Sequence, residues 1–119
     1  MKKFLFSLFA TMLIGFGASA QVKAVQTAKI STPTVQCNMC KNKIETYLKR
    51  YDGIHTINVN VKKKETTVKY ITDRINEEEI KTAIANAGYD AAEITANPDS
   101  YKRLPKCCKK PEDGGGMTQ

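Results

Sequence analysis

The chain has 119 residues, of which 41% are hydrophobic and 26% are charged, and its formal net charge is +7. This length leaves room for one small domain. A basic balance is compatible with nucleic acid, an anionic membrane or an acidic partner protein. The basic residues are not interleaved with aromatic ones in the arrangement on which bases stack, so we expect no nucleic-acid partner.

The first 20 residues, 1–20, predict a secretory signal peptide. Lys2 and Lys3 give a positive start, residues 4–16 form an almost unbroken apolar run, and residues 18–20 form a small-residue cleavage site. The apolar run is shorter than the roughly 20 residues of a membrane-spanning helix. We therefore expect cleavage before Gln21, a periplasmic or secreted location, and no stable membrane insertion afterwards.

Residues 21–96 predict one α+β domain. Alternating or helical apolar spacing, with turn residues between, marks the successive elements. The expected elements are a strand at 27–33, a helix from the Cys37–Cys40 segment to about 52–53, a hairpin over 56–70 with its turn at 62–64, a helix from 76 to 88 and a last strand at 89–95. This order predicts a ferredoxin-like βαββαβ sandwich, a four-stranded antiparallel sheet with two helices on one face.

Each helix carries its own sequence signals. In the first, Cys40, Ile44 and Leu48 recur on one face. In the second, Asn76 and Glu79 have the spacing of a capping box, which predicts where that helix begins.

Residues 97–119 differ in composition from the domain. Prolines and a run of three glycines dominate this segment, which predicts a flexible tail. The tail carries an adjacent cysteine pair, Cys107 and Cys108, between lysines.

The most informative motif is the segment Cys37-Asn38-Met39-Cys40. It places two thiols in a loop and the first turn of a helix, so we expect them close together and near the surface, with Met39 pointing outward. The helix N-terminus favours their thiolate forms. Two such sulfurs suit either a soft metal ion or cycling between dithiol and disulfide.

Structural disulfides are a third interpretation, because exported proteins usually oxidise their cysteines. A bond within either close pair, Cys37 with Cys40 or Cys107 with Cys108, closes only a tiny loop. Such a bond constrains the unfolded chain little, so the spacing argues against this interpretation.

Among metals, a two-thiolate site favours Cu(I) or Hg(II), which accept near-linear coordination. Zn(II) and Cd(II) fit less well, because structural zinc takes four ligands. An open site also allows a partner thiol to take the ion, so we expect a carrier and not an enzyme. The alternative is a periplasmic thiol–disulfide oxidoreductase, but the chain has no Trp, a residue that commonly accompanies the CxxC of thioredoxin-like sites.

The chain resembles the heavy-metal-associated domain family, which includes copper(I) chaperones, metal-binding domains of copper-transporting ATPases and periplasmic mercury-binding proteins. The resemblance covers roughly residues 28 to 94. It rests on the CxxC with its helix, the Asp52-Gly53-Ile54 turn, the strand residues Val59-Asn60-Val61 and the distal Ala87-Gly88-Tyr89-Asp90.

The resemblance implies that Cys37 and Cys40 bind the metal and that Tyr89 lies close to the metal loop. A metal-transporting membrane protein, or another thiol-bearing acceptor, is then the expected partner of a monomeric carrier.

The tail cysteines lie outside the part of the chain that the resemblance covers. About ten residues separate Asn97 from Cys107, enough to span about 30 Å when extended, so the tail can return its thiols to the CxxC. Three outcomes stay open: Cys107 and Cys108 as additional ligands, a tail without a metal role, or a disulfide that guards the site.

Overall fold

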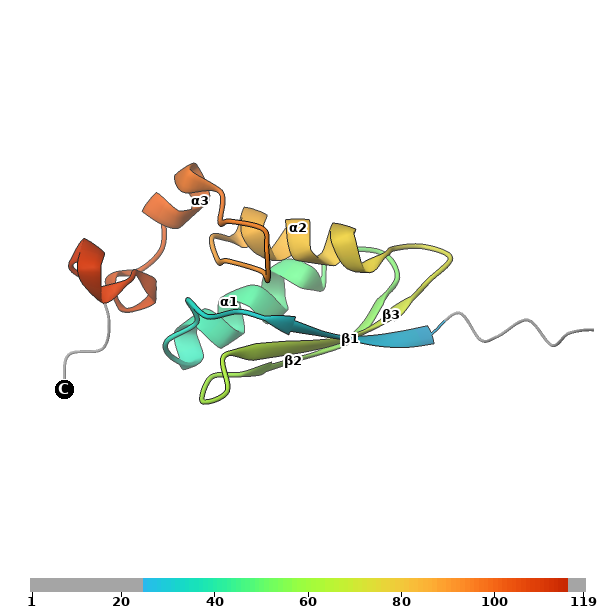
Figure 1. The fold of residues 1–119 in the computed structure, drawn as a ribbon. Coiled ribbons are helices and arrows are strands. Elements are labelled where there is room, and N and C mark those ends of the chain that lie inside the picture. Colours follow the sequence, from blue (N-terminus) through green and yellow to red (C-terminus); the bar gives the residue numbers. More distant parts are fainter. Residues whose placement is uncertain (1–24, 116–119) are drawn as a thin grey trace, which may run out of the picture.

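The computed structural model describes residues 25–115 (Figure 1). The predicted signal peptide, residues 1–20, lies outside the described residues. The elements are β1 Val25–Ser31, α1 Asn38–Leu48, β2 Ile54–Asn60, β3 Glu65–Ile71, α2 Glu77–Ala87, α3 Pro98–Lys102 and the 3₁₀ turns η1 Lys106–Cys108 and η2 Pro111–Asp113. None of the helices within 25–115 is long and apolar enough to cross a membrane.

The described strands form an antiparallel sheet in the order β1-β3-β2. The alternation predicted for β1 is confirmed, because Ala28 and Ile30 are buried while Lys29 is exposed between them. Beyond the strand, the Thr32 hydroxyl lies 3.0 Å from the Thr66 hydroxyl of β3. This buried pair satisfies two polar groups inside the core.

Helices α1 and α2 lie side by side on one face of the sheet (Figure 1). The buried face of α1 is that of Cys40, Ile44 and Leu48, as their spacing predicts. The predicted capping box of α2 is confirmed: the Asn76 side chain accepts from the Glu79 N–H, and the Glu79 carboxylate accepts from the Asn76 N–H. The core therefore lies between these helices and the sheet.

The prediction of a fourth strand at 89–95 is wrong, and the described sheet has three strands. The segment curls back on itself with a single bridge between Ala91 and Ile94. The left-handed φ of Ala92, +51°, forces the turn, and the Asp90 side chain accepts a hydrogen bond from the Ala96 N–H. One hydrogen bond, from the Ala92 N–H to the Ser31 carbonyl, still ties the segment to the end of β1.

The C-terminal segment, residues 97–115, folds into short helical turns where the sequence predicts a flexible tail. Asn97 caps α3 by accepting from the backbone N–H groups of Asp99 and Ser100. Leu104 is buried, and its side chain lies against Gly88, whose φ of +108° ends α2. These contacts hold the segment against the domain, at the end where α1 begins (Figure 1).

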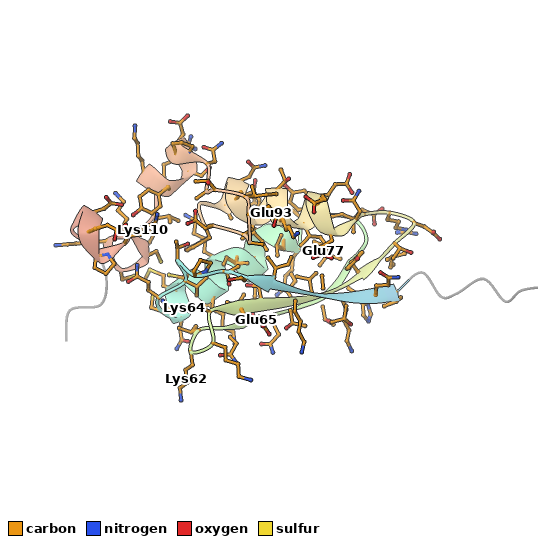
Figure 2. All side chains as sticks on the ribbon, in the orientation of Figure 1. Lys62, Lys64, Glu65, Glu77, Glu93 and Lys110 are labelled. Carbon is orange, nitrogen blue, oxygen red and sulfur yellow. The ribbon has the colours of Figure 1, made fainter. Side chains whose placement is uncertain are left out.

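Charged side chains of both signs cover the described surface (Figure 2). Lys62 and Lys64 belong to the β2–β3 turn and Lys110 to the C-terminal segment, whereas Glu77 begins α2. The lysines of the β2–β3 turn thus lie directly before Glu65, the first residue of β3.

Candidate metal centre

The loop that leads into the CxxC is fastened by a lysine from the β2–β3 turn. The Lys64 ammonium donates to the carbonyl oxygens of Pro33, at 3.3 Å, and Val35, at 3.0 Å. The carbonyl of Lys64 also accepts from the Thr32 N–H at 2.8 Å. The hairpin therefore braces the loop. No sequence pattern predicts this role, because Lys64 is one of three consecutive lysines in a polar turn.

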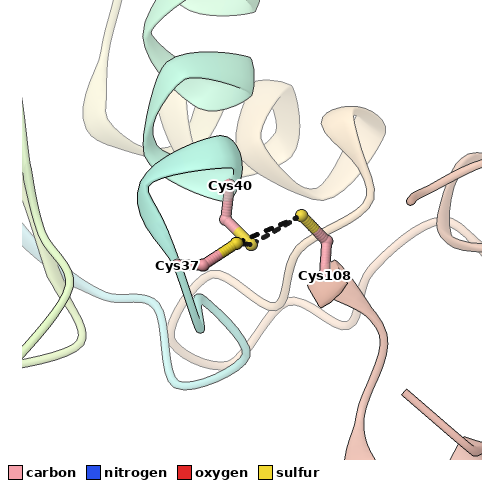
Figure 3. A group of neighbouring side chains, drawn as sticks. All are labelled: Cys37, Cys40 and Cys108. Atoms are coloured by element: carbon pink, nitrogen blue, oxygen red, sulfur yellow. Dashed lines mark hydrogen bonds between the residues drawn. The ribbon is translucent and has the colours of Figure 1, made fainter. Parts of the chain in front are cut away.

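The CxxC places its two sulfurs side by side. Cys37 is the extended residue before α1, with φ of −152°, and Cys40 lies in the first turn. Their Sγ atoms are 3.4 Å apart (Figure 3). The expected closeness is confirmed, but the expected position near the surface is wrong. Cys37 is 8% exposed and Cys40 is fully buried.

The tail cysteines account for this burial. Cys108 is itself fully buried, and its Sγ lies 2.7 Å from that of Cys40 and 4.0 Å from that of Cys37 (Figure 3). All four cysteines are free thiols. The structure thus brings the tail back to the CxxC, as the length of the tail allows.

Cys107 occupies the outer edge of the same group. Its Sγ lies 3.4 Å from the Cys37 sulfur and 3.9 Å from the Cys108 sulfur, and it is only partly buried. It also lies 3.6 Å from the thioether sulfur of Met39, whose side chain is 53% exposed, in line with its predicted outward direction. The edge of the sulfur group that Cys107 and Met39 form is therefore the one that faces solvent.

The pKa values of the Cys37 and Cys108 thiols are shifted in opposite directions by their surroundings. Burial opposes ionisation of Cys37, but hydrogen bonds to its sulfur, led by the one from the Cys40 backbone N–H, lower its pKa below the ordinary value. Burial, followed by the neighbouring Cys40 sulfur, raises the pKa of Cys108. Cys37 is therefore more readily ionised than Cys108.

Tyr89 lies beneath the sulfurs, close to the loop, as the resemblance implies. It is fully buried, and burial together with the Cys108 and Cys40 sulfurs raises its pKa. Within residues 25–115 its hydroxyl has no hydrogen-bond partner. The next residue ties this segment to the loop, because the Asp90 N–H donates to the Thr34 hydroxyl at 3.1 Å.

Sequence reasoning also missed Gln36, which fixes the tail over the loop. Its side-chain amide donates to the carbonyl of Lys109, the residue after Cys108. A single polar residue before the CxxC carries no pattern from which this contact follows.

Known proteins share the domain that holds this site. The sequence model of the heavy-metal-associated domain matches residues 21–90. A copper-exporting P-type ATPase of Staphylococcus aureus (strain Newman) is 28% identical over 90 residues, which are 76% of this chain and 11% of the ATPase. The chain thus spans only about a tenth of that relative.

Solved structures show the same α+β fold. A CopZ metallochaperone superposes with a TM-score of 0.55 and 25% identity, covering 56% of this chain and all of that one (100%). The mercury-bound form of MerP, described as the periplasmic protein of the bacterial mercury detoxification system, gives 0.51 and 25%, covering 58% of this chain and 96% of that one.

The match extends over more than half of the chain and includes Cys37, Cys40 and Tyr89. The resemblance found in the sequence is thereby confirmed, and the chain belongs to the heavy-metal-associated domain family.

Proposed function

We propose that this protein is an exported carrier of a soft metal ion, Cu(I) or Hg(II), held by the thiolates of Cys37 and Cys40. The observation that carries the proposal is the pair of sulfurs 3.4 Å apart at the start of α1, in a loop that the hairpin holds in place. Thiolates are soft ligands and prefer such ions to hard divalent cations. The relatives support both metals, since one is a copper-exporting ATPase and another is a mercury-bound periplasmic protein.

Delivery proceeds by ligand exchange. A thiolate of the acceptor forms a bond to the ion as the bond to one of the carrier sulfurs breaks, and the released carrier thiolate takes up a proton. No electron is transferred, and the ion keeps its charge. The acceptor is a thiol-bearing metal transporter of the membrane, in keeping with the occurrence of this domain in copper-exporting ATPases.

The binding step is tested by titrating the reduced protein anaerobically with Cu(I), and in parallel with Hg(II), against a chromogenic chelator. We expect each chain to withdraw one ion from the chelator. The loaded protein should then pass the ion to an isolated CxxC domain of a copper-exporting ATPase. Failure to compete with the chelator for either ion contradicts the proposal. Repeated reduction of a disulfide substrate favours the oxidoreductase alternative instead.

Export is tested separately, because it depends on residues 1–20 alone. We expect the protein recovered from the periplasmic fraction of its host to begin at Gln21, as read by N-terminal sequencing or intact mass. A variant in which Asp replaces Leu5 and Leu13 interrupts the apolar run and should remain in the cytoplasm with its N-terminus uncut. Recovery of the unaltered protein from the cytoplasm in uncut form would rule out the exported role.

A further inference from the structure

We propose that Cys108 is a third ligand, so that the ion lies in a closed site formed by the sulfurs of Cys37, Cys40 and Cys108. The inference rests on the proposed function, and it assigns a metal-binding role to a residue outside the 21–90 match. It concerns one ion and three thiolates, with Cys107 outside the coordination sphere.

The geometry of the three sulfurs carries the inference. Their Sγ atoms all lie within 4.8 Å of one another, at 3.4, 2.7 and 4.0 Å for the three pairs, and all three residues are buried. A metal–sulfur bond of about 2.3 Å in a planar three-coordinate site separates the sulfurs by about 4 Å. The Cys37–Cys108 pair is already at that separation, and the pairs that involve Cys40 need only to open by a small side-chain movement.

The position of Cys108 does not depend on its thiol. The Lys110 N–H donates to the Tyr101 hydroxyl at 2.8 Å, and the Lys110 ammonium lies 3.8 Å from the Asp90 carboxylate. Together with the Gln36 contact to Lys109 and the buried Leu104, these contacts bracket Cys108 on both sides. A ligand that is held in place before the ion arrives costs less conformational entropy on binding.

Cys107 provides a matched comparison in the adjacent position. Both cysteines belong to one 3₁₀ turn, closed by the hydrogen bond from the Cys108 N–H to the Pro105 carbonyl, and their Sγ atoms are 3.9 Å apart. Cys108 enters the buried group, whereas Cys107 stays at the exposed edge beside Met39. The two cysteines share sequence surroundings and differ in burial, so exchanging them separates ligation from a general effect of tail thiols.

The third sulfur changes how the ion is released. A two-sulfur site leaves the ion open to an acceptor thiol. In this protein Cys108 covers the CxxC sulfurs and shields them from solvent. An acceptor thiol must therefore approach along the Cys107 edge or displace the C-terminal segment. The site holds its ion more tightly and exchanges it more slowly than a CxxC alone.

The test is the Cu–S coordination number, measured by X-ray absorption on the reduced, Cu(I)-loaded full chain. We expect three sulfurs for the unaltered protein, two for Cys108→Ser and three for Cys107→Ser. The affinity for Cu(I) should fall about tenfold or more in Cys108→Ser. Mutation of residues that only hydrogen-bond to metal ligands already lowers metal affinity by about that factor. It should change little in Cys107→Ser. Circular dichroism reports the fold, and Cys108→Ala replaces the serine variant if the buried hydroxyl prevents folding.

Each alternative result identifies what has failed. Two sulfurs in the unaltered protein would overturn the third ligand and leave the CxxC carrier intact. Loss of one sulfur in Cys107→Ser but not in Cys108→Ser would mean that the wrong tail thiol has been assigned. Two ions bound per chain would contradict the single-ion site and indicate a metal cluster instead. No Cu(I) bound by any form would contradict the proposed function itself.

Discussion

Replacing both Cys37 and Cys40 with Ser is expected to weaken Cu(I) binding by at least about a thousandfold, which corresponds to roughly 4 kcal/mol. The hydroxyl of Ser is a hard, neutral ligand, whereas Cu(I) prefers soft thiolates. The sulfurs that remain on the tail cannot reproduce the site, because Cys107 lies at its exposed edge. Competition with a chromogenic chelator under anaerobic conditions gives the affinity.

The control for this variant is Cys107→Ser, which removes a neighbouring thiol of the same group and should keep nearly full affinity. Because Cys40 is fully buried, its replacement also places a hydroxyl in the core, at a cost to stability of about 1–3 kcal/mol if the hydroxyl stays unpaired. Urea denaturation monitored by circular dichroism must therefore show that the variant remains folded at the temperature of the binding assay. Equal Cu(I) affinity in the double variant and the unaltered protein would show that the CxxC does not bind the ion.

Tyr89→Ala is expected to lower the free energy of unfolding by about 3–5 kcal/mol, the range for truncating a buried aromatic side chain. Tyr89 is among the largest fully buried side chains, and it lies beneath the sulfurs at the end of α2. Its removal leaves a cavity that the braced loop cannot readily fill. Equilibrium denaturation in urea measures the change, provided that the denaturant dependence stays the same in both proteins.

Tyr89→Phe is the matched control, since it keeps the ring and removes only the hydroxyl. That hydroxyl is buried and has no hydrogen-bond partner among residues 25–115. Its removal is therefore expected to leave stability unchanged or slightly increased. A loss of more than about 1 kcal/mol on Tyr89→Phe would mean that the hydroxyl is hydrogen-bonded in solution. A small loss on Tyr89→Ala would mean that the ring does not support the loop.

Local patterns were enough to predict most of the domain. The face of α1, the capping box of α2 and the alternation in β1 each depend on residues within a few positions of one another. Such short-range signals fix where an element begins and which side it buries. For the same reason the CxxC could be assigned to a loop and a first helical turn before any tertiary contact was known.

The last strand could not be predicted in this way, because the apolar alternation of residues 89–95 is limited to Tyr89, Asp90 and Ala91. In the fold, Tyr89 and Ala91 are buried, as a strand would have them. The turn at Ala92 and the contact between Asp90 and Ala96 then end the extended run. These local turn contacts outweigh the tendency of the segment to form a strand.

The covering of the metal centre depends on contacts between distant parts of the chain. Gln36 contacts Lys109 across 73 residues, and Lys64 contacts the loop across about 30. No periodicity in the sequence predicts contacts between residues so far apart. The sequence therefore indicated only that the tail was long enough to bring its cysteines to the CxxC. The sequence could not indicate that the folded tail would bury Cys37 and Cys40.

The sulfurs of Cys40 and Cys108 meet although 68 positions separate them in the chain. An ion that bonds to both therefore acts as a removable cross-link between the start of α1 and the C-terminal segment. By the chain-entropy argument that applies to disulfides, closing a loop of this length disfavours the unfolded chain by about 4 kcal/mol. If Cys108 is a ligand as proposed, the bound ion stabilises the protein against unfolding, and the protein that has released its ion is the less stable form.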